Sequence, residues 1–135
     1  MKLRFLGKNS VNGDCPTLYA TDRDSYVVQG FRVFENDLLT RLDIRDGQTV
    51  VAVPEELFTH LTKDGASTGE IQRLEAPVMI RTEDGTFVVQ GQEVTDTEAL
   101  EQMSIPAWET CVEVPRPDLI ALLEEPRGAD YQRPA

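Results

Sequence analysis

The chain is poor in the features that mark membrane-spanning and secreted proteins. Among its 135 residues, no apolar run reaches the roughly 18 to 20 residues that a membrane-spanning helix needs. The N-terminal stretch is too short for a signal peptide and has no small-residue cleavage site. Only two cysteines are present, Cys15 and Cys111, too few for a disulfide framework. These absences predict a cytoplasmic protein with two free thiols.

Positive charge is also scarce. The chain has 13 Lys and Arg against 24 Asp and Glu, and its formal net charge is −11. Proteins that bind nucleic acids neutralise phosphates with Lys and Arg, and the sole basic cluster here is formed by Lys2, Arg4 and Lys8. We therefore do not expect direct binding of DNA or RNA. The negative charge instead favours encounter with a basic protein partner.

Residues that catalyse reactions or bind metals are few. The single histidine, His60, and two distant cysteines cannot supply the four ligands of a zinc site. No nucleotide-binding, nucleophile-elbow or calcium-loop motif is present. We therefore expect no metal, no cofactor and no catalytic residue. A cleft that brought Cys15, His60 and a carboxylate together would revive the possibility of an enzyme.

What the chain does contain is an internal repeat. Residues 16–61, shifted by 61 positions, align without a gap on residues 77–122, and 14 of the 46 aligned positions are identical. The strongest match joins Tyr-Val-Val-Gln-Gly at 26–30 to Phe-Val-Val-Gln-Gly at 87–91. Apolar positions are kept while polar positions vary, which is expected of two copies of one core.

Each copy is predicted to have the element order ββαβα. A hairpin with a polar turn comes first, and then a helix with a buried stripe of Leu38, Leu39 and Leu42 in the first copy. Pro54 and Pro115 predict the first turn of a closing helix. The strands are predicted at 17–21, 26–33 and 49–53 in the first copy, and at 78–82, 87–94 and 110–114 in the second.

Local signals refine this prediction. Thr95 and Glu98 have the spacing of a capping box at the start of the second copy's helix, whereas the first copy has Asn36 available as a cap. Gly30 and Gly91 lie inside strands, which indicates a bulge or a close backbone approach. The glycine- and serine-rich connector between the copies is predicted to be flexible.

A module of about 46 residues rarely buries enough apolar surface to be stable alone. We therefore predict an α+β fold in which two ββαβα modules pack around a pseudo-twofold axis and share one core, like a homodimer fused into one chain. The predicted organisation is an N-terminal strand and loop (1–15), a first repeat (16–61), a linker (62–75), a second repeat (76–123) and a flexible tail (124–135).

The duplicated Val-Val-Gln-Gly provides the candidate site. It is either a strand interior with a bulge or a place where Gln29 and Gln90 approach each other near the pseudo-twofold axis and bind a peptide or a small polar ligand. Trp108 is predicted to lie on a loop, where it would serve as an interface anchor or as a lid over the core. The candidate ligand or interface residues are Gln29, Gly30, Phe31, Gln90, Gly91, Gln92 and Trp108.

Three segments carry a resemblance to a known group of proteins. Pro-Thr-Leu-Tyr-Ala-Thr at 16–21, Tyr-Val-Val-Gln-Gly at 26–30 and Glu-Thr-Cys-Val-Glu-Val-Pro at 109–115 resemble small acidic actinobacterial proteins that are often encoded beside Xre-type helix-turn-helix regulators. In that group an aromatic residue follows Val-Val-Gln-Gly, a pattern that Phe31 keeps and Gln92 does not. The resemblance implies a regulatory role and no particular activity.

These observations predict a non-enzymatic regulatory or interaction protein. We expect it to bind a protein partner, such as a helix-turn-helix regulator, through its acidic surface. The second repeat is the more acidic, with nine acids and two bases against eight and four in the first. The alternative is a small-molecule sensor with a pocket between the repeats, and an enzyme ranks third.

Overall fold

The computed structural model describes residues 1–9 and 16–123. The predictions for Cys15 and for the tail at 124–135 therefore lie outside the described residues. Within the described residues, no helix combines the length and the hydropathy that a membrane span requires.

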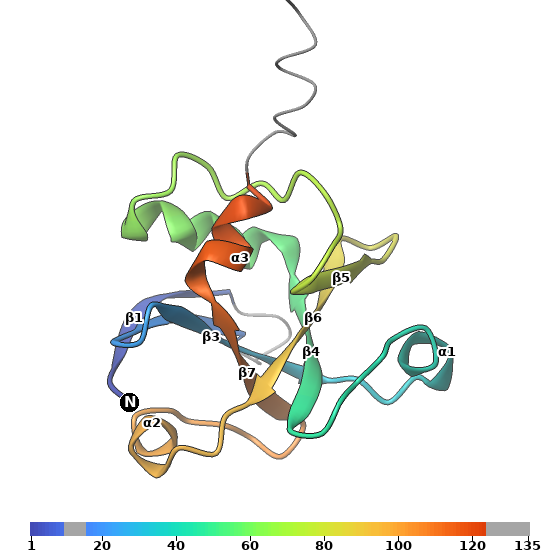
Figure 1. Ribbon diagram of the computed structural model, residues 1–135, viewed down its shortest axis with the longest axis horizontal. Coiled ribbons are helices and arrows are strands. Elements are labelled where there is room, and N and C mark those ends of the chain that lie inside the picture. The colour runs from blue at the N-terminus through green and yellow to red at the C-terminus, as the bar shows by residue number, and fades with distance from the viewer. Residues whose placement is uncertain (10–15, 124–135) are drawn as a thin grey trace, which may run out of the picture.

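The described chain folds into seven strands and four short helices (Figure 1). This confirms a mixed fold of strands and helices, with an antiparallel sheet as its main element. The strands are β1 (Leu3–Lys8), β2 (Thr17–Thr21), β3 (Ser25–Arg32), β4 (Gln48–Pro54), β5 (Val78–Arg81), β6 (Thr86–Glu93) and β7 (Glu109–Pro115). The helices are α1 (Asn36–Leu39), the 3₁₀ helix η1 (Glu55–Asp64), α2 (Thr97–Glu101) and α3 (Arg116–Ala121).

Four of the strands close into a ring. β3 pairs with both β4 and β7, and β6 also pairs with both β4 and β7. The predicted hairpins are present, since β2 pairs with β3 and β5 pairs with β6, and β1 extends the sheet beyond β2. Helices η1 and α3 lie together at one end of the ring, α2 lies at the opposite end, and α1 lies to one side (Figure 1).

The longest strand pairings join the first half of the chain to the second. Val28 lies opposite Val112 across β3 and β7, and Val89 lies opposite Val51 across β6 and β4. Val89 is 61 positions after Val28, and Val51 is 61 positions before Val112. The third strand of each half is therefore placed mainly against the hairpin of the other half.

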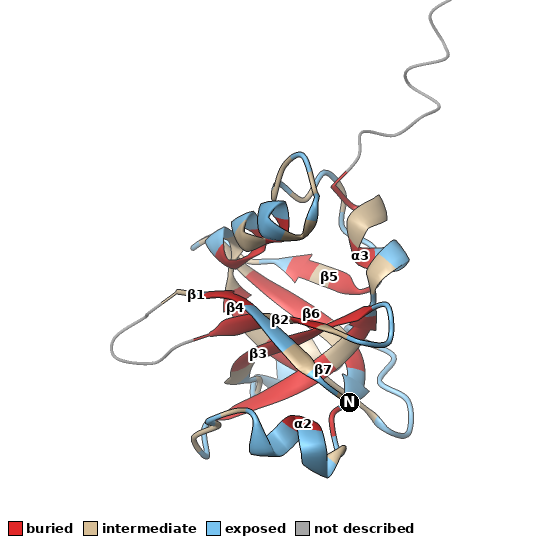
Figure 2. Ribbon diagram, turned by 90° about the vertical axis from the view of Figure 1, so that its left-hand side faces the viewer, coloured by how far each residue is buried: buried red, intermediate tan, exposed pale blue. Residues whose placement is uncertain are grey.

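One large apolar core fills the space between the ring and the helices η1 and α3. Val51 and Val112 both belong to it, so both halves contribute to the same core. Buried positions follow the ring strands through the centre of the molecule (Figure 2). Two smaller clusters lie outside it, one around Val27 and Cys111 beneath the α2 segment and one around Val50 and Val88 beneath the α1 segment.

The glycines of the duplicated motif lie where two backbones cross. A β-carbon on Gly30 would lie 2.6 Å from the carbonyl oxygen of Ala52 and 2.5 Å from Val53 Cγ1. A β-carbon on Gly91 would lie 2.6 Å from the carbonyl oxygen of Glu113. Of the two predicted reasons for these glycines, the close backbone approach is the one that the structure shows.

The helices differ from their predictions. α1 contains only four residues and has no side-chain cap, so the expected two-turn stripe is one turn of half-buried leucines. The predicted Thr95–Glu98 capping box is wrong, because Asp96 is the N-cap of α2 and accepts a hydrogen bond from the Ala99 N–H at 2.9 Å. Such caps are favourable because they satisfy one of the free N–H groups in the first turn.

The ends of the third strands and the connector also differ. Pro54 and Pro115 end β4 and β7 and precede the closing helices, instead of lying in their first turn. The predicted linker begins inside η1, which extends to Asp64. Beyond it, Gly69 packs against the backbone of Phe58, and Gln72 donates its N–H to the Leu122 carbonyl at 2.7 Å. The connector is therefore attached to the core at several points.

Asp64 links four elements at the end of the molecule that carries η1. Its carboxylate accepts hydrogen bonds from Tyr26 Oη at 2.6 Å, from Arg116 Nε at 3.2 Å and from Arg4. Burial alone would raise the pKa of Asp64, but these hydrogen bonds outweigh it and lower that pKa. Burial, followed by the hydrogen bond to Asp64, raises the pKa of Tyr26 to about 12.

This pKa of Tyr26 predicts a loss of stability in alkali. The folded chain keeps the phenol proton to about pH 12, whereas the unfolded chain releases it near 10.0. Stability from this group is therefore fully present below about pH 10 and falls as the pH rises towards 12. Tyr26→Phe should lose about 1 kcal/mol at neutral pH and show a shallower decline between these pH values in urea unfolding curves. Equal slopes for the two proteins would contradict the assignment.

Candidate binding site

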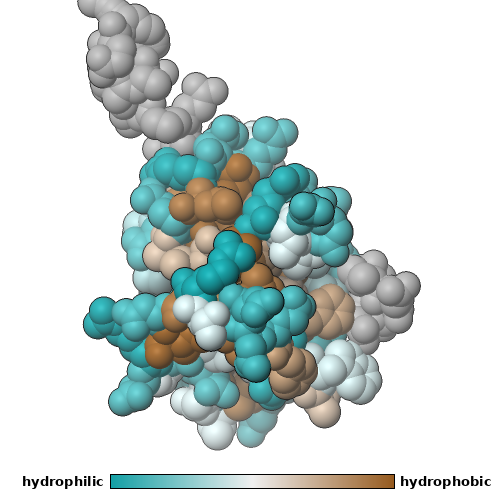
Figure 3. Space-filling model, turned by 90° about the vertical axis from the view of Figure 1, so that its right-hand side faces the viewer, coloured by the Kyte–Doolittle hydropathy of each residue, from teal (hydrophilic) through white to brown (hydrophobic). Residues whose placement is uncertain are grey.

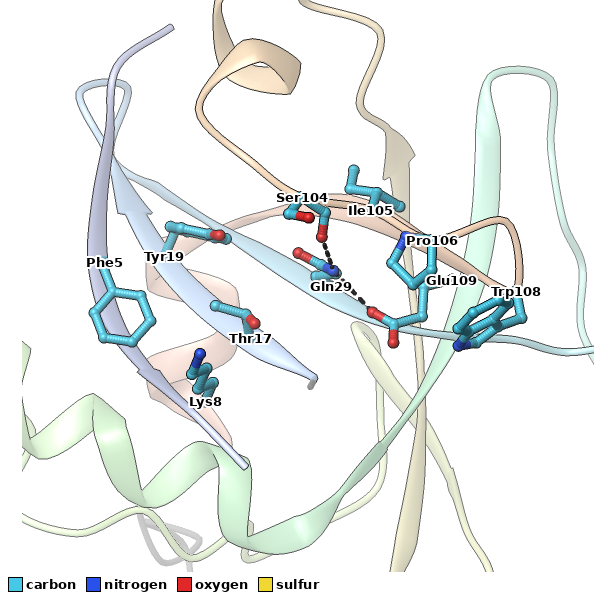
Figure 4. Close-up of a pocket in the computed structure, with 10 residues that line it drawn as sticks. All are labelled: Phe5, Lys8, Thr17, Tyr19, Gln29, Ser104, Ile105, Pro106, Trp108 and Glu109. Atoms are coloured by element: carbon cyan, nitrogen blue, oxygen red, sulfur yellow. Dashed lines mark hydrogen bonds between the residues drawn. The ribbon is translucent and has the colours of Figure 1, made fainter. Parts of the chain in front are cut away.

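A cavity of about 460 Å³ lies between strands β1 and β2 and the loop that joins α2 to β7. Figure 4 shows its lining side chains, which come from three separate parts of the chain. The lining residues are Phe5, Lys8, Thr17, Tyr19, Gln29, Ser104, Ile105, Pro106, Trp108 and Glu109. Its volume lies within the range of roughly 300 to 1,000 Å³ that is usual for ligand sites.

The carboxyl group of Glu109 is the unusual feature of this cavity. Glu109 is the first residue of β7 and is only 1% exposed. Its Oε1 accepts a hydrogen bond of 2.8 Å from Gln29 Nε2, which also donates to the Ser104 carbonyl at 3.0 Å. Its Oε2 is buried and accepts no hydrogen bond from any described residue. A buried acid with an unpartnered oxygen is an energetically costly arrangement.

The corresponding turn in the first half supplies one more hydrogen-bond donor than the turn that carries Glu109. There Gln90 Nε2 donates to Gln48 Oε1 at 2.9 Å and to the Asp43 carbonyl at 2.8 Å. Gln48 Oε1 also accepts from the Arg45 N–H at 3.2 Å. The residue 61 positions after Arg45 is Pro106, which has no N–H to donate. Glu109 thus receives one hydrogen bond where Gln48 receives two.

Aromatic rings line the cavity on both sides of this acid. Phe5 is 56% exposed and Trp108 is 54% exposed. Phe5 meets Tyr19 edge to face, with ring centroids 6.1 Å apart. Burial, and to a smaller extent Cys111, raises the pKa of the Tyr19 phenol, which therefore stays neutral at physiological pH. The cavity combines exposed aromatic surface with a buried acid.

Arg32 holds the loop that carries Trp108. Its backbone N–H donates to the Trp108 carbonyl at 3.0 Å, and its Nε donates to the Ala107 carbonyl at 3.0 Å. Because the peptide carbonyls before and after the Cα of Trp108 are both anchored to Arg32 of β3, the indole is presented from a fixed backbone. A fixed aromatic residue loses little conformational entropy on binding.

Six of the seven predicted site residues are spread over three cavities. Gln29 and Trp108 lie in the cavity just described. Gln90, Gly91 and Gln92 line a different one of about 310 Å³, so the structure does not bring Gln29 and Gln90 into one site. Gly30 lies where the backbones of β3 and β4 cross, and its lack of a side chain allows their close approach.

Phe31 lies in a third cavity, on the face of the molecule that carries α1. This cavity has a volume of about 580 Å³, and polar and apolar residues, among them Phe31, Val33 and Leu38, line it in nearly equal numbers. Apolar side chains form separate patches between hydrophilic ones over this face (Figure 3). The face therefore offers no continuous apolar surface.

The sequence prediction missed Glu109, Phe5, Lys8 and Tyr19. Phe5 and Lys8 lie before the repeat, so no internal comparison includes them. For Glu109 a signal exists, because the aligned residues Gly47 and Gln48 become Trp108 and Glu109 while the flanking apolar pattern stays the same. This replacement of a glycine and an amide by an indole and an acid indicates a local difference in role.

His60 and Cys111 do not form a reactive pair. His60 lies over Gly7 and forms a hydrogen bond of 3.0 Å with Asn9 Oδ1, and burial, followed by the charge of Lys63, lowers its pKa. Burial raises the pKa of the Cys111 thiol to about 12, so the nucleophilic thiolate is scarce at neutral pH. Within residues 1–9 and 16–123, no group of three or more His, Cys, Asp or Glu side chains is arranged to hold a metal.

The sequence resemblance to actinobacterial proteins beside helix-turn-helix regulators stays a prediction. Inferences about function therefore start from the geometry of the cavity. Comparison of the chain with protein-family models, with curated proteins and with solved structures finds no match.

Proposed function

We propose that the protein is a non-enzymatic binding module that takes up a positively charged side chain of a partner protein in the Glu109 cavity. The observation that carries this proposal is the buried Glu109 carboxyl group with one unpartnered oxygen, in a cavity lined by half-exposed aromatic rings. A cation satisfies both features, because it pairs with the acid and is attracted to the faces of Trp and Phe rings.

The charge of the whole chain supports a basic partner. A net charge of −11 attracts basic proteins over a distance and disfavours direct contact with nucleic acids. A DNA-binding regulator, the partner class that the sequence resemblance implies, exposes the Arg and Lys side chains that such a cavity requires. Binding of those side chains would occlude the surface with which a regulator contacts DNA.

We also propose that the chain is a tandem duplication of a ββαβα module with pseudo-twofold symmetry, whose halves have diverged in function. The offset of 61 residues that relates the β3–β7 and β4–β6 pairings supports this proposal, as do the matching contacts of Gly30 and Gly91. The divergence in function is then due to three residues of the second half, which create an acidic, aromatic cavity in that half alone: Pro106, Trp108 and Glu109.

A small-molecule sensor is the second candidate. A cavity of about 460 Å³ is large enough for a free cationic metabolite. This candidate differs from the sequence prediction, in which the pocket lies between the repeats and is lined by Gln29, Gln90 and aromatic residues. The two candidates differ in the size of the ligand that the cavity binds.

The proposal is tested by adding a short basic peptide with several Arg and Lys side chains to the protein at physiological salt. Trp108 is the single tryptophan of the chain, so its fluorescence reports binding at this cavity. We expect a saturable change with the basic peptide and none with an acidic peptide of the same length. Free arginine and lysine, added separately, distinguish a sensor of small molecules from a module that needs a protein segment.

Glu109→Gln supplies the decisive variant. Gln48 has the same position in the first half, so glutamine fits the fold and can still accept the hydrogen bond from Gln29. We expect affinity for the basic peptide to fall about 30-fold, or about 2 kcal/mol, without a lower thermal midpoint, because a buried acid has been removed. Gln48→Ala, in the other half, is the control and should leave the affinity unchanged. Equal peptide affinity for Glu109→Gln and the unaltered protein would refute the proposal.

A further inference from the structure

Ammonium and guanidinium groups make different demands on a binding cavity. An ammonium is compact and strongly hydrated, whereas a guanidinium is planar, weakly hydrated and able to stack on aromatic rings. Three features of the Glu109 cavity separate the two.

The acceptors of the cavity are fixed in position. Gln29 Nε2 donates to both Glu109 Oε1 and the Ser104 carbonyl, at 2.8 and 3.0 Å, and Gln29 itself is 2% exposed. Glu109 Oε2 and a second lone pair of the Ser104 carbonyl thus remain as acceptors, on two groups that the Gln29 amide holds in place. A guanidinium has several N–H groups in a rigid plane and can donate to two such acceptors at once.

The rings favour a flat cation. Trp108 and Phe5 each leave about half of their surface exposed, and both line the cavity. A guanidinium can lie parallel to an indole face while its edge donates hydrogen bonds, which combines stacking with the cation–π attraction. An ammonium gains the attraction without the stacking area.

Lys8 opposes a compact cation. Its side chain lines the same cavity and forms no salt bridge with any residue of the described chain. A second concentrated positive charge beside Lys8 is repelled, and it must also lose tightly bound water to reach a residue that is 1% exposed. A guanidinium spreads its charge over a larger surface and loses water more readily.

We infer that the Glu109 cavity is specific for the guanidinium of an arginine side chain, which pairs with Glu109 and stacks on Trp108. This inference rests on the proposed function and names the group that the partner provides. The partner is thus a protein segment with an exposed arginine, and a lysine in the same place is a poor substitute.

The test uses two blocked amino acids as probes, Nα-acetyl-arginine N-methylamide and the corresponding lysine compound. Each is titrated into the full-length ¹⁵N-labelled protein while the single indole N–H signal of Trp108 is followed by NMR. We expect the arginine compound to bind at least about tenfold more tightly, which corresponds to about 1.4 kcal/mol. Lys8→Met should reduce this preference, because it improves binding of the lysine compound more than that of the arginine compound.

The outcomes separate the inference from the proposed function. If the lysine compound binds as tightly as the arginine compound, the guanidinium inference is wrong and the proposed binding of cations stands. If neither compound nor the basic peptide shifts the Trp108 signal, the proposed function fails as well. Trp108→Leu, followed through backbone signals of β7, should retain the fold and lose the preference for arginine.

Discussion

Gly30→Ala is expected to destabilise the protein by about 3 kcal/mol, the upper end of the usual range for overpacked sites. The added methyl group would lie 2.6 Å from the Ala52 carbonyl oxygen and 2.5 Å from Val53 Cγ1. A backbone atom cannot move aside as a flexible side chain can, so β3 and β4 must separate. Gly91→Ala should have a similar effect, since its methyl group would meet the Glu113 carbonyl oxygen at 2.6 Å.

Gly65→Ala is the matched control for these two substitutions. Gly65 has a φ of 97°, and a β-carbon there would have no atom within 4 Å. Its replacement therefore costs about 1 kcal/mol for the left-handed backbone alone. Urea unfolding at 25 °C measures all three variants. Equal losses for Gly30→Ala and Gly65→Ala would show that close packing is not the reason for glycine at the crossing.

Phe58→Ala is expected to lower stability by about 3 to 5 kcal/mol. Phe58 lies on η1 in the first half and is fully buried. The centroid of its ring is 5.8 Å from the centroid of the Phe87 ring, which lies on β6 in the second half. Removing it leaves a cavity in the core that both halves share. The loss should therefore appear in both halves at once, as a single transition at lower urea concentration.

Two signals distinguish shared from separate unfolding. Trp108 fluorescence follows the loop between α2 and β7, and far-ultraviolet circular dichroism follows the whole chain. We expect the two curves to coincide in the unaltered protein and in Phe58→Ala. Phe34→Ala is the control, because Phe34 is 77% exposed and its loss should change stability by less than about 0.5 kcal/mol. If Phe58→Ala lowered the urea midpoint of the circular dichroism transition but left that of the Trp108 fluorescence unchanged, the halves would unfold independently.

Local sequence pattern predicts the strands of this protein well. The alternation of apolar residues and the polar turns place β2, β3, β6 and β7 within a residue or two of their observed limits. The pattern cannot tell which strands pair beyond a hairpin, because a third strand presents the same apolar face to either copy. The pairing of β4 with β6 and of β7 with β3 is therefore decided by tertiary packing. The length of α1 is decided in the same way, because its leucines cover only a small cluster.

The site was only partly predictable. Gln29 and Trp108 were expected, the former from its duplicated motif and the latter as the single tryptophan. Glu109 has the sequence context of a solvent-exposed acid at the start of a strand, and its burial depends on Gln29 and on the loop that Arg32 anchors. Phe5 and Lys8 reach the cavity from β1, which is distant in sequence. Contacts of this kind have no local signature.

The exchange of third strands between the halves has a consequence for a chain that is cut. If the backbone were severed in the segment between η1 and β5, every strand pairing of the ring would still be possible, because the ring interlocks the two pieces without the connector. Each piece alone would expose strand edges that lack their partners, a condition that promotes aggregation. We therefore expect the two pieces to aggregate less when they are combined than when they are kept apart.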